Sequence, residues 1–260
     1  MFAVERREKI QEMLQQQGRV SVAELSEVFG VSDDTIRLDL KHLEEHRLLI
    51  RTHGGALPVK KVSHSTPYGQ RLNLEAEEKV AIAQIAVQLV QPGDTILLEG
   101  STTTRPMADF LPENAGLTVV TNSPGIANAV IVREGIAVIL LGGKLDKDAQ
   151  VAVGPIVIEQ IARMRVDRAF FSTSGFLYNR GATSASIEDA FMKKAFVAAA
   201  KQRVLLVTGA KFGQEGLMLS LPLSDIDTVV CGSGATDSEL NSLIENGIKV
   251  LKSEWNPSSE

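Results

Sequence analysis

The sequence has one cysteine, no long apolar run and no excess of basic residues, and each absence excludes a class of protein. The single cysteine, Cys231, cannot form an internal disulfide or a cysteine-ligated zinc site. A membrane-spanning helix needs about 20 consecutive apolar residues, whereas the apolar runs here, such as residues 136–141, are short. The N-terminus has no apolar run after its charges, so we expect no signal peptide and a cytoplasmic protein.

Motifs of several enzyme classes are also missing. The sequence contains no glycine-rich dinucleotide fingerprint, no phosphate-binding P-loop and no nucleophile elbow. All four histidines lie between residues 42 and 64 and are not spaced as metal ligands, so the rest of the chain has no histidine to act as a general base. We therefore expect no cofactor, no metal and no catalytic site.

What is present is an ordinary globular composition. The 260 residues are 44% hydrophobic and 23% charged, which fits one large domain or two smaller ones. The net charge is −5, and residues 1–61 hold ten basic and ten acidic residues. Nucleic-acid-binding domains are expected to be basic, so charge alone does not indicate one.

Residues 1–57 nevertheless show the pattern of three short helices followed by a small hairpin. Gly18 ends the first helix, and the hydroxyls of Ser21 and Ser32 cap the second and third. Apolar residues at 48–52 and 56–59 flank a tight turn and predict two strands. This order is that of a winged helix-turn-helix domain, whose third helix enters the major groove of DNA. A small helical dimerisation module is the alternative.

Polar side chains of the third helix and the hairpin are the candidate DNA contacts. They are Ser32, Thr35, Arg37, Lys41, His42, Arg51 and His53. Arg37 is the candidate for a phosphate or guanine contact, since a guanidinium can bind either through two hydrogen bonds.

Beyond residue 57 the pattern changes. The polar segment 58–73 contains two prolines and predicts a linker, after which short apolar strands alternate with helices over residues 74–255. That alternation predicts an α/β domain with a parallel or mostly parallel sheet covered by helices on both faces. Ligands of such sheets bind beyond the carboxyl ends of the strands.

Polar or glycine-rich residues follow three of these strands, at 99–104, 121–123 and 141–144. Hydroxyls beside free N–H groups at a helix start suit a phosphate or a polyol, although they also serve simply as helix caps. The candidate effector-binding residues are Glu99, Gly100, Ser101, Thr102, Thr103, Thr104, Asn122, Gly142, Gly143 and Lys211. Further charged candidates are Asp167, Glu188, Asp189, Lys193 and Lys194.

Taken together, these residues resemble the DeoR/GlpR family of bacterial transcriptional repressors over nearly the whole chain. The segments that carry the resemblance are 18–22, 35–40, 51–56, Arg71, 78–79, 101–104, 121–123, 141–143 and 211–213. The resemblance implies a winged helix-turn-helix joined to a sensor domain similar to ribose-5-phosphate isomerase. It also implies double-stranded operator DNA and a phosphorylated sugar or polyol as partners, a homo-oligomer, and repression of genes for sugar or polyol use.

The sequence departs from the family pattern at several positions. Leu38 stands where the family usually has a second arginine, which removes a potential contact to DNA. Glu99 replaces an aspartate in the ligand loop, Thr208 replaces another aspartate, and Cys231-Gly232 replaces a Thr-Asp pair. These changes bear more on the effector than on DNA binding.

We interpret the protein as a cytoplasmic repressor in which the hydroxyl loop binds the effector's phosphate, Lys211 adds positive charge and Glu99 accepts from sugar hydroxyls. An enzyme is the main alternative: a sugar-phosphate isomerase with an added N-terminal module, using Glu99 or Glu188 for acid–base chemistry. A protein-interaction scaffold, in which the winged helix binds a protein partner, is the other.

Overall fold

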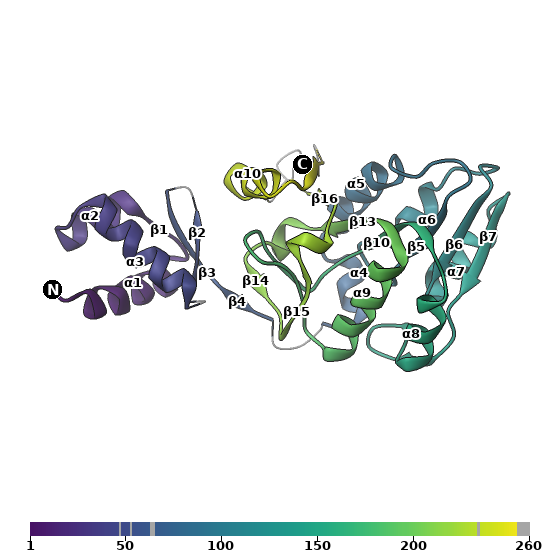
Figure 1. Cartoon of the computed structure of the whole chain (residues 1–260), viewed down its shortest axis with the longest axis horizontal. Helices are drawn as coiled ribbons and strands as arrows, with labels where there is room; N and C mark the ends of the chain where they lie inside the picture. Colours follow the sequence, from purple (N-terminus) through teal and green to yellow (C-terminus); the bar gives the residue numbers. More distant parts are fainter. Residues whose placement is uncertain (47, 53, 63–65, 233–234, 254–260) are drawn as a thin grey trace.

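The chain folds into two domains that lie side by side and are joined by a short extended segment (Figure 1). The computed structural model describes residues 1–46, 48–52, 54–62, 66–232 and 235–253. None of the helices in these ranges is long and apolar enough to cross a membrane.

The N-terminal domain is a winged helix-turn-helix. Its helices are α1 (Ala3–Gln17), α2 (Val22–Phe29) and α3 (Asp33–Glu45), and its strands are β1 (Val20–Ser21), β2 (Leu49–Thr52) and β3 (Gly55–Pro58). Buried apolar side chains from all three helices, among them Ile10, Leu25 and Ile36, form one core with Leu49 and Ala56 of the wing. This core fixes the angle at which α3 is presented.

Short-range rules set the ends of these helices. Gly18 and Gly30 follow α1 and α2 in the left-handed conformation, with φ of 73° and 64°. The Ser21 hydroxyl accepts a hydrogen bond from the Glu24 backbone N–H at 3.2 Å, and the Ser32 hydroxyl accepts one from Thr35 N–H at 3.3 Å. The predicted caps are therefore confirmed.

The wing has one strand more than the two predicted from the sequence. The sheet order is β1-β3-β2, so β3 is central, with Val20 opposite Ala56 and Ser21 opposite Gly55. A Cβ atom at Gly55 would lie 1.9 Å from the Val20 carbonyl oxygen, so only glycine permits this pairing. A two-residue strand has no sequence period, which is why β1 was not predicted.

The second domain is built on a seven-stranded parallel sheet in the order β17-β16-β13-β10-β5-β6-β7. The strands are β5 (Thr95–Leu98), β6 (Leu117–Thr121), β7 (Ile136–Leu140), β10 (Val166–Phe171), β13 (Ala200–Val207), β16 (Thr228–Cys231) and β17 (Lys249–Lys252). The sequence predicts strands at 95–98, 117–121, 136–141, 166–172, 204–207, 228–231 and 249–251. The observed strands overlap all of these, although β7 and β10 each end one residue earlier, and the expected parallel sheet is confirmed.

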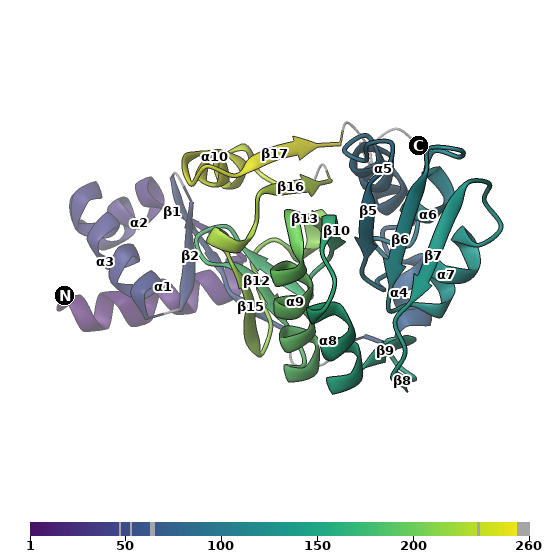
Figure 2. The same cartoon turned by 45° about the vertical axis from the view of Figure 1, so that its right-hand side comes forward.

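Helices cover both faces of this sheet (Figure 2). One face packs against α5 (Ala76–Val87), α6 (Met107–Phe110) and α7 (Pro124–Val130). The other packs against α8 (Pro155–Ala162), α9 (Ile187–Ala199) and α10 (Asp237–Glu245). The sequence predicts a helix over 102–111, but α6 is shorter, because residues 102–106 form turns before it begins.

Smaller strands extend the sheet domain. They are β8 (Lys144–Asp146) with β9 (Val151–Val153), and β11 (Gly175–Leu177) with β12 (Gly181–Ser184) and β15 (Met218–Pro222). All these pairs are antiparallel. The β8–β9 hairpin follows the glycines at 142–143 and carries the chain past the strand ends.

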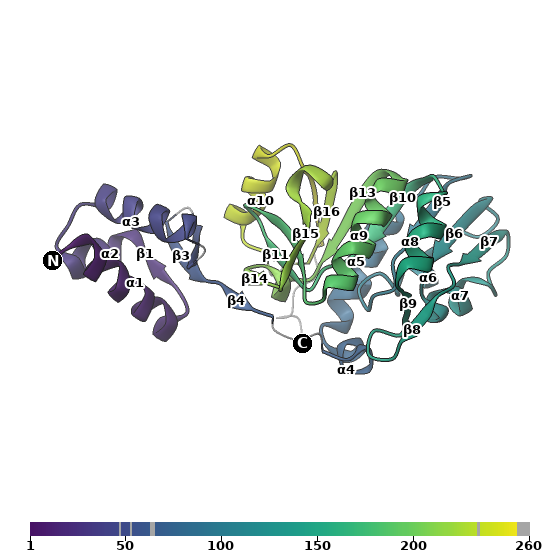
Figure 3. The ribbon, with the colours of Figure 1, turned by 60° about the horizontal axis from the view of Figure 1, so that its bottom comes forward.

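Residues 58–73, expected to be a linker, contain two ordered elements. Strand β4 (Lys60–Lys61) pairs in parallel with β14 (Gln214–Glu215), and helix α4 (Tyr68–Asn73) follows it (Figure 3). The pairing partner lies more than 150 residues away in the sequence, so neither periodicity nor composition of 58–73 could predict it.

Candidate functional site

A cavity of about 710 Å³ lies at the carboxyl ends of the central strands β5, β6 and β10. Its wall is formed by residues that follow these strands, by the start of α9, by the β8–β9 hairpin, and by α4 with the segment before it. Most of the lining side chains are polar or charged, so a small hydrophilic ligand fits the cavity better than an apolar one.

The loop after β5 presents unused hydrogen-bond donors to this cavity. The backbone N–H groups and hydroxyls of Thr102 and Thr103 donate no hydrogen bond to any described residue. Ser101 and Thr104, by contrast, bond to each other, and the Thr104 hydroxyl also donates to the Glu99 carbonyl. Thr104 therefore stabilises the conformation of the loop, whereas the donors of Thr102 and Thr103 are available to a ligand.

Asn122 positions this loop. Its Oδ1 accepts from Gly100 N–H at 2.9 Å, and its Nδ2 donates to the Ala152 carbonyl at 3.1 Å. A Cβ at Gly100 would lie 2.2 Å from Val151 Cγ1. The ends of β5 and β6 and the β8–β9 hairpin are thus held together by one amide and one close contact.

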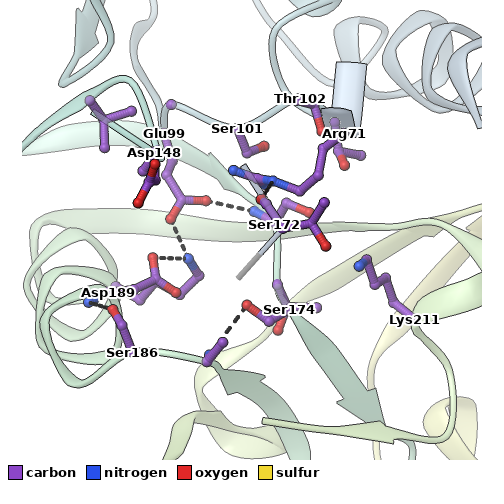
Figure 4. A pocket seen from close by; sticks show the side chains of 18 of the residues that line it. Arg71, Glu99, Ser101, Thr102, Asp148, Ser172, Ser174, Ser186, Asp189 and Lys211 are labelled. Atoms are coloured by element: carbon purple, nitrogen blue, oxygen red, sulfur yellow. Dashed lines mark hydrogen bonds and ion pairs between the residues drawn. The ribbon is translucent and has the colours of Figure 1, made fainter. Parts of the chain in front are cut away.

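Two cations reach the cavity without a carboxylate partner. Arg71, on α4, and Lys211, in the one-turn 3-10 helix Gly209–Lys211, both line it and form no ion pair within the described ranges. Burial lowers the pKa of Lys211 and also that of Arg71. Figure 4 shows Arg71 near Ser101 and Thr102, with Lys211 on the same side of the cavity. Glu75 also lines the cavity and acts electrostatically on Lys211, but Arg71, Lys79 and Lys211 outnumber it, so this side is electropositive.

The opposite side is acidic. Lys193, on α9, is buried between Glu99 and Asp189, with its Nζ donating to Glu99 Oε1 and, at 2.6 Å, to Asp189 Oδ1. Burial acts to lower the pKa of Lys193, but the two carboxylates outweigh it and raise that pKa. Asp148 lies near Glu99 on this side (Figure 4). The cavity thus has an electropositive end and an acidic end.

Glu99 is not available in the way the sequence suggested. Its Oε1 accepts from Lys193 and its Oε2 accepts from Ser172 N–H at 2.8 Å. Burial raises the pKa of this carboxyl, with Lys193 acting against the rise. Both oxygens are engaged within the protein, so Glu99 fixes Lys193 rather than presenting a free carboxylate to sugar hydroxyls.

The cavity brings together most, but not all, of the predicted effector residues. The predicted effector residues that line it are Glu99, Gly100, Ser101, Thr102, Thr103, Asn122 and Lys211, and the further candidates that line it are Glu188, Asp189 and Lys193. Thr104 is fully buried beneath the loop. Gly142 donates its N–H to Gln160 Oε1, and Gly143 packs against Val157, so neither lines the cavity. A glycine pair indicates that another group packs closely against the backbone, but it does not show whether that group is a ligand or a side chain of the protein.

Asp167 and Lys194 also lie apart from the cavity lining, and Asp167 instead accepts hydrogen bonds from Thr95 N–H and Lys201. The residues that sequence reasoning missed are Arg71, Lys79, Ser172, Thr173, Ser174, Ser186, Asp146 and Asp148. The run 172–174 follows an apolar strand and carried the same signal as 101–104. Arg71 and Lys79 were named only as part of the family resemblance and not as site residues, because nothing in the polar segment 58–73 indicates that Arg71 reaches a strand end.

In the winged helix, α3 presents Arg37, Leu38 and Lys41 to solvent. The Arg37 guanidinium pairs with two carboxylates of its own helix, at 2.8 Å from Asp34 and 3.5 Å from Asp33. Ser32 and Thr35 bond to each other at the start of α3, and His42 stacks on His46 at 4.2 Å. His53 lies outside the described residues.

Arg51 is placed differently from the other candidate DNA contacts. Its backbone N–H donates to Glu44 Oε1 at 3.2 Å, and its guanidinium lies 3.9 Å from Glu44 Oε2. Glu44 Oε1 also accepts from Asn179 of the second domain at 3.1 Å. Arg51 therefore lies at the junction between the domains, because the wing strands are on the side of the winged helix that faces the sheet domain (Figure 1).

Comparison with known proteins agrees with both halves of the structure. Residues 6–62 match the DeoR-like helix-turn-helix domain, and residues 74–233, more than half of the chain, match the DeoR C terminal sensor domain. The repressor GlcR of Bacillus subtilis is 33% identical over 98% of each chain. The glycerol-3-phosphate regulon repressor of Escherichia coli is 31% identical over 96% of this chain and 99% of its own length.

Similar solved structures include a ribose-5-phosphate isomerase in complex with phospho-erythronic acid, with a TM-score of 0.38, 16% identity and coverage of 53% of this chain and 54% of that one. The sorbitol operon regulator SorC of Klebsiella pneumoniae aligns with a TM-score of 0.41 and 14% identity over 94% of this chain and 99% of its own. Both domain matches and the full-length relatives show that the chain belongs to the DeoR family of helix-turn-helix transcriptional regulators.

Proposed function

We propose that this protein is a repressor that binds operator DNA through α3 and is released by a small phosphorylated sugar or polyol. The observation that carries the effector assignment is the polarity of the 710 Å³ cavity. Thr102, whose hydroxyl and N–H donate to no described residue, lies on the same side as Arg71 and Lys211, which form no ion pair within the described ranges (Figure 4). Such donors and cations together bind phosphate, while Asp148 on the acidic side accepts from hydroxyl groups.

The names of relatives support this effector class. One is the glycerol-3-phosphate regulon repressor, which names a phosphorylated polyol. We propose that the protein binds its operator as a homo-oligomer, since winged helices of this kind read two half-sites about 34–36 Å apart. We also propose that it acts in the cytoplasm, where the operator is.

A thermal-shift screen of phosphorylated sugars and polyols tests the effector assignment, because a ligand that binds only the native state raises the melting temperature. The matching non-phosphorylated compounds are the control. The effector should also release the protein from its own upstream DNA in a gel-shift experiment. If compounds with and without phosphate raise the melting temperature equally, the electropositive end does not bind phosphate.

The double variant Thr102→Val/Thr103→Val examines the loop itself. It removes two hydroxyls and nearly preserves side-chain volume, so folding and operator binding should persist while the effector response is lost. Each hydrogen bond to a charged group is worth about 1.5–3 kcal/mol, so effector affinity should fall at least tenfold. Release at an unchanged effector concentration would contradict the placement of the phosphate.

We further propose that the protein is not an isomerase. That chemistry needs a carboxylate free to accept a proton, and both oxygens of Glu99 are engaged by Lys193 and Ser172. Assay of the purified protein with pentose phosphates should show no turnover, and turnover lost in Glu188→Gln would overturn this part of the proposal.

A further inference from the structure

The cavity wall includes part of the segment that joins the two domains. Val62 and Thr66, which lie between the wing and α4, both line the cavity together with Arg71. In Figure 3, β4 leads from the wing towards the sheet domain, and α4 lies at the edge of that domain. A ligand in the cavity therefore lies against the covalent connection to the DNA-binding domain.

Arg71 is the residue that touches both the connection and the cavity. Its Nε donates to the Thr66 carbonyl at 2.7 Å, and its guanidinium carbon lies 5.9 Å from the centre of the Tyr68 ring. Its Nη1 and Nη2 donate to none of the described residues. Because a guanidinium carries five N–H donors in a planar fork, one edge can hold Thr66 while the other binds an anion.

The helix that carries Arg71 is itself fixed to the sheet domain. Buried Lys79 on α5 donates through Nζ to the carbonyls of Arg71 and Leu74. Tyr68 N–H donates to the Asp148 carbonyl at 2.7 Å. The backbone of α4 therefore belongs to the sheet domain, and the Arg71 side chain reaches from it to the connecting segment.

The other end of the segment is held by residues next to the cavity. Val62 N–H donates to the Glu215 carbonyl at 2.8 Å, and β4 pairs with β14, whose Gln214 lines the cavity. On the wing, Ile50 packs into the apolar core of the sheet domain. A change in how the segment is held thus bears directly on where the winged helix sits.

We propose that Arg71 couples effector occupancy to the DNA-binding domain by binding the effector's anionic group through Nη1 and Nη2 while Nε holds the Thr66 carbonyl. This proposal rests on the proposed effector site. An anion on the free edge of the guanidinium restricts its rotation, so the bond to Thr66 persists and the connecting segment is fixed in one position. Without the anion, the same arginine holds the segment through a single hydrogen bond.

Hydrogen–deuterium exchange of the full-length protein tests the coupling, with inorganic phosphate as the probe and chloride at equal ionic strength as the control. The reporter amides are those of Val62 and Tyr68, whose hydrogen bonds hold the two ends of the segment. If phosphate binds only when the segment is held, these amides should exchange about tenfold more slowly at a phosphate concentration ten times its Kd.

Two variants separate coupling from simple binding, compared at equal phosphate occupancy set by calorimetry. Arg71→Lys keeps the charge but lacks the fork, because a lysine presents one point of contact, so it should bind phosphate without protecting the reporter amides. Lys211→Gln removes the other cation but leaves the Arg71–Thr66 bond, so it should bind more weakly and still protect them. Melting temperatures confirm that both variants fold, and Arg71→Gln provides a second loss of the fork.

The outcomes distinguish the two proposals. If wild-type protein does not bind phosphate, the electropositive end is not an anion site, and the effector assignment fails together with the coupling. If phosphate binds but the amides of Val62 and Tyr68 exchange at the same rate, the coupling alone fails. It also fails if Arg71→Lys protects those amides as well as the wild type does at equal occupancy.

Discussion

Each domain contains a group of three charged side chains built around a buried ion, Asp39 in one and Lys193 in the other, and the two groups differ in net charge and in position. In the winged helix, Asp39 accepts from Arg6 Nε at 2.5 Å and from Arg7 Nε at 2.8 Å. In the sheet domain, Lys193 donates to Glu99 and Asp189. The first group has one excess positive charge and the second one excess negative charge.

Their surroundings explain the difference. The Arg6–Arg7–Asp39 group joins α1 to α3 and does not line the 710 Å³ cavity, so its contacts orient the helix that presents Arg37. The Lys193 group joins β5 to α9 at the cavity wall. Burying ions costs free energy that a hydrophobic replacement avoids, so we infer that each group is retained for the position it fixes.

Removal of Lys193 should have the largest effect. Lys193→Met leaves the Glu99 carboxylate buried without its counter-charge, which costs about 3–5 kcal/mol when a buried pair is broken. Chemical denaturation at neutral pH measures the loss. Lys194→Met, the adjacent exposed lysine on α9, is the matched control and should leave stability nearly unchanged.

The same variant should show a distinctive pH dependence. Burial already raises the folded-state pKa of Glu99 above its unfolded value, and loss of Lys193 raises that pKa further. A raised carboxyl pKa opposes folding at pH values above it, so the deficit should be largest above the folded-state pKa and should shrink as the pH falls through it. A deficit independent of pH would mean that Glu99 is not the group left unpaired.

Asp39→Ala should have the next largest effect. It leaves Arg6 and Arg7 without their shared carboxylate, but both lie close enough to solvent for their guanidinium groups to turn outward, with 9% and 23% of each side chain exposed. We expect a loss of about 1.5–3 kcal/mol, the range for hydrogen bonds to charged groups, and weaker operator binding because α3 loses its tie to α1. Arg7→Ala, which leaves the Arg6–Asp39 pair intact, should cost less. An equal loss in both variants would show that Arg7 carries the interaction.

Features that depend on neighbouring residues could be predicted from the sequence, whereas contacts between distant residues, such as that of Lys193 with Glu99, could not. Helix ends such as Gly18, Ser21 and Ser32 depend only on neighbours within a few residues, so they could be predicted from the sequence. The loop 101–103 was predicted because it follows an apolar strand. The pairing of Lys193 with Glu99 joins positions 94 residues apart, and Lys193 was only one charged candidate among several.

Arg71 marks the limit most clearly. It lies in a polar segment whose composition indicates a linker, and it reaches the cavity only because α4 packs beside α5 through Lys79. For the glycines at 142–143 the prediction was wrong in the other direction, because a site was predicted where none is found. Their pattern matched a ligand loop, but they do not line the cavity, and the β8–β9 hairpin that follows them does. The local sequence pattern predicted which polar residues follow strands, whereas tertiary packing determines which of these residues lie together in the cavity.

A third charged group, formed by Arg37 with Asp33 and Asp34, is the exposed counterpart of the buried two. Exposed pairs contribute little to stability, so Arg37→Ala should leave the melting temperature nearly unchanged. Operator binding should weaken by about 1–3 kcal/mol if Arg37 makes a bidentate base contact. A phosphate contact would instead weaken binding to all sequences alike and lower the salt slope by about one. Unchanged binding to every DNA sequence would contradict the assignment of α3 to the groove.

The smallest effect is expected for Asp34→Asn, where two contributions have opposite signs. Asp34 lies in the first turn of α3, where a negative charge stabilises the helix by about 0.3–1 kcal/mol, so the free protein should lose that much. The same carboxylate holds the Arg37 guanidinium at 2.8 Å, and DNA must displace it to reach Arg37. Its removal should therefore tighten operator binding, most clearly at low salt, while stability falls. Fluorescence anisotropy at two salt concentrations measures the first quantity and thermal denaturation the second. In an Arg37→Ala background the gain attributable to releasing Arg37 should vanish, and a gain of the same size there would mean that Asp34 acts on DNA only through its own charge.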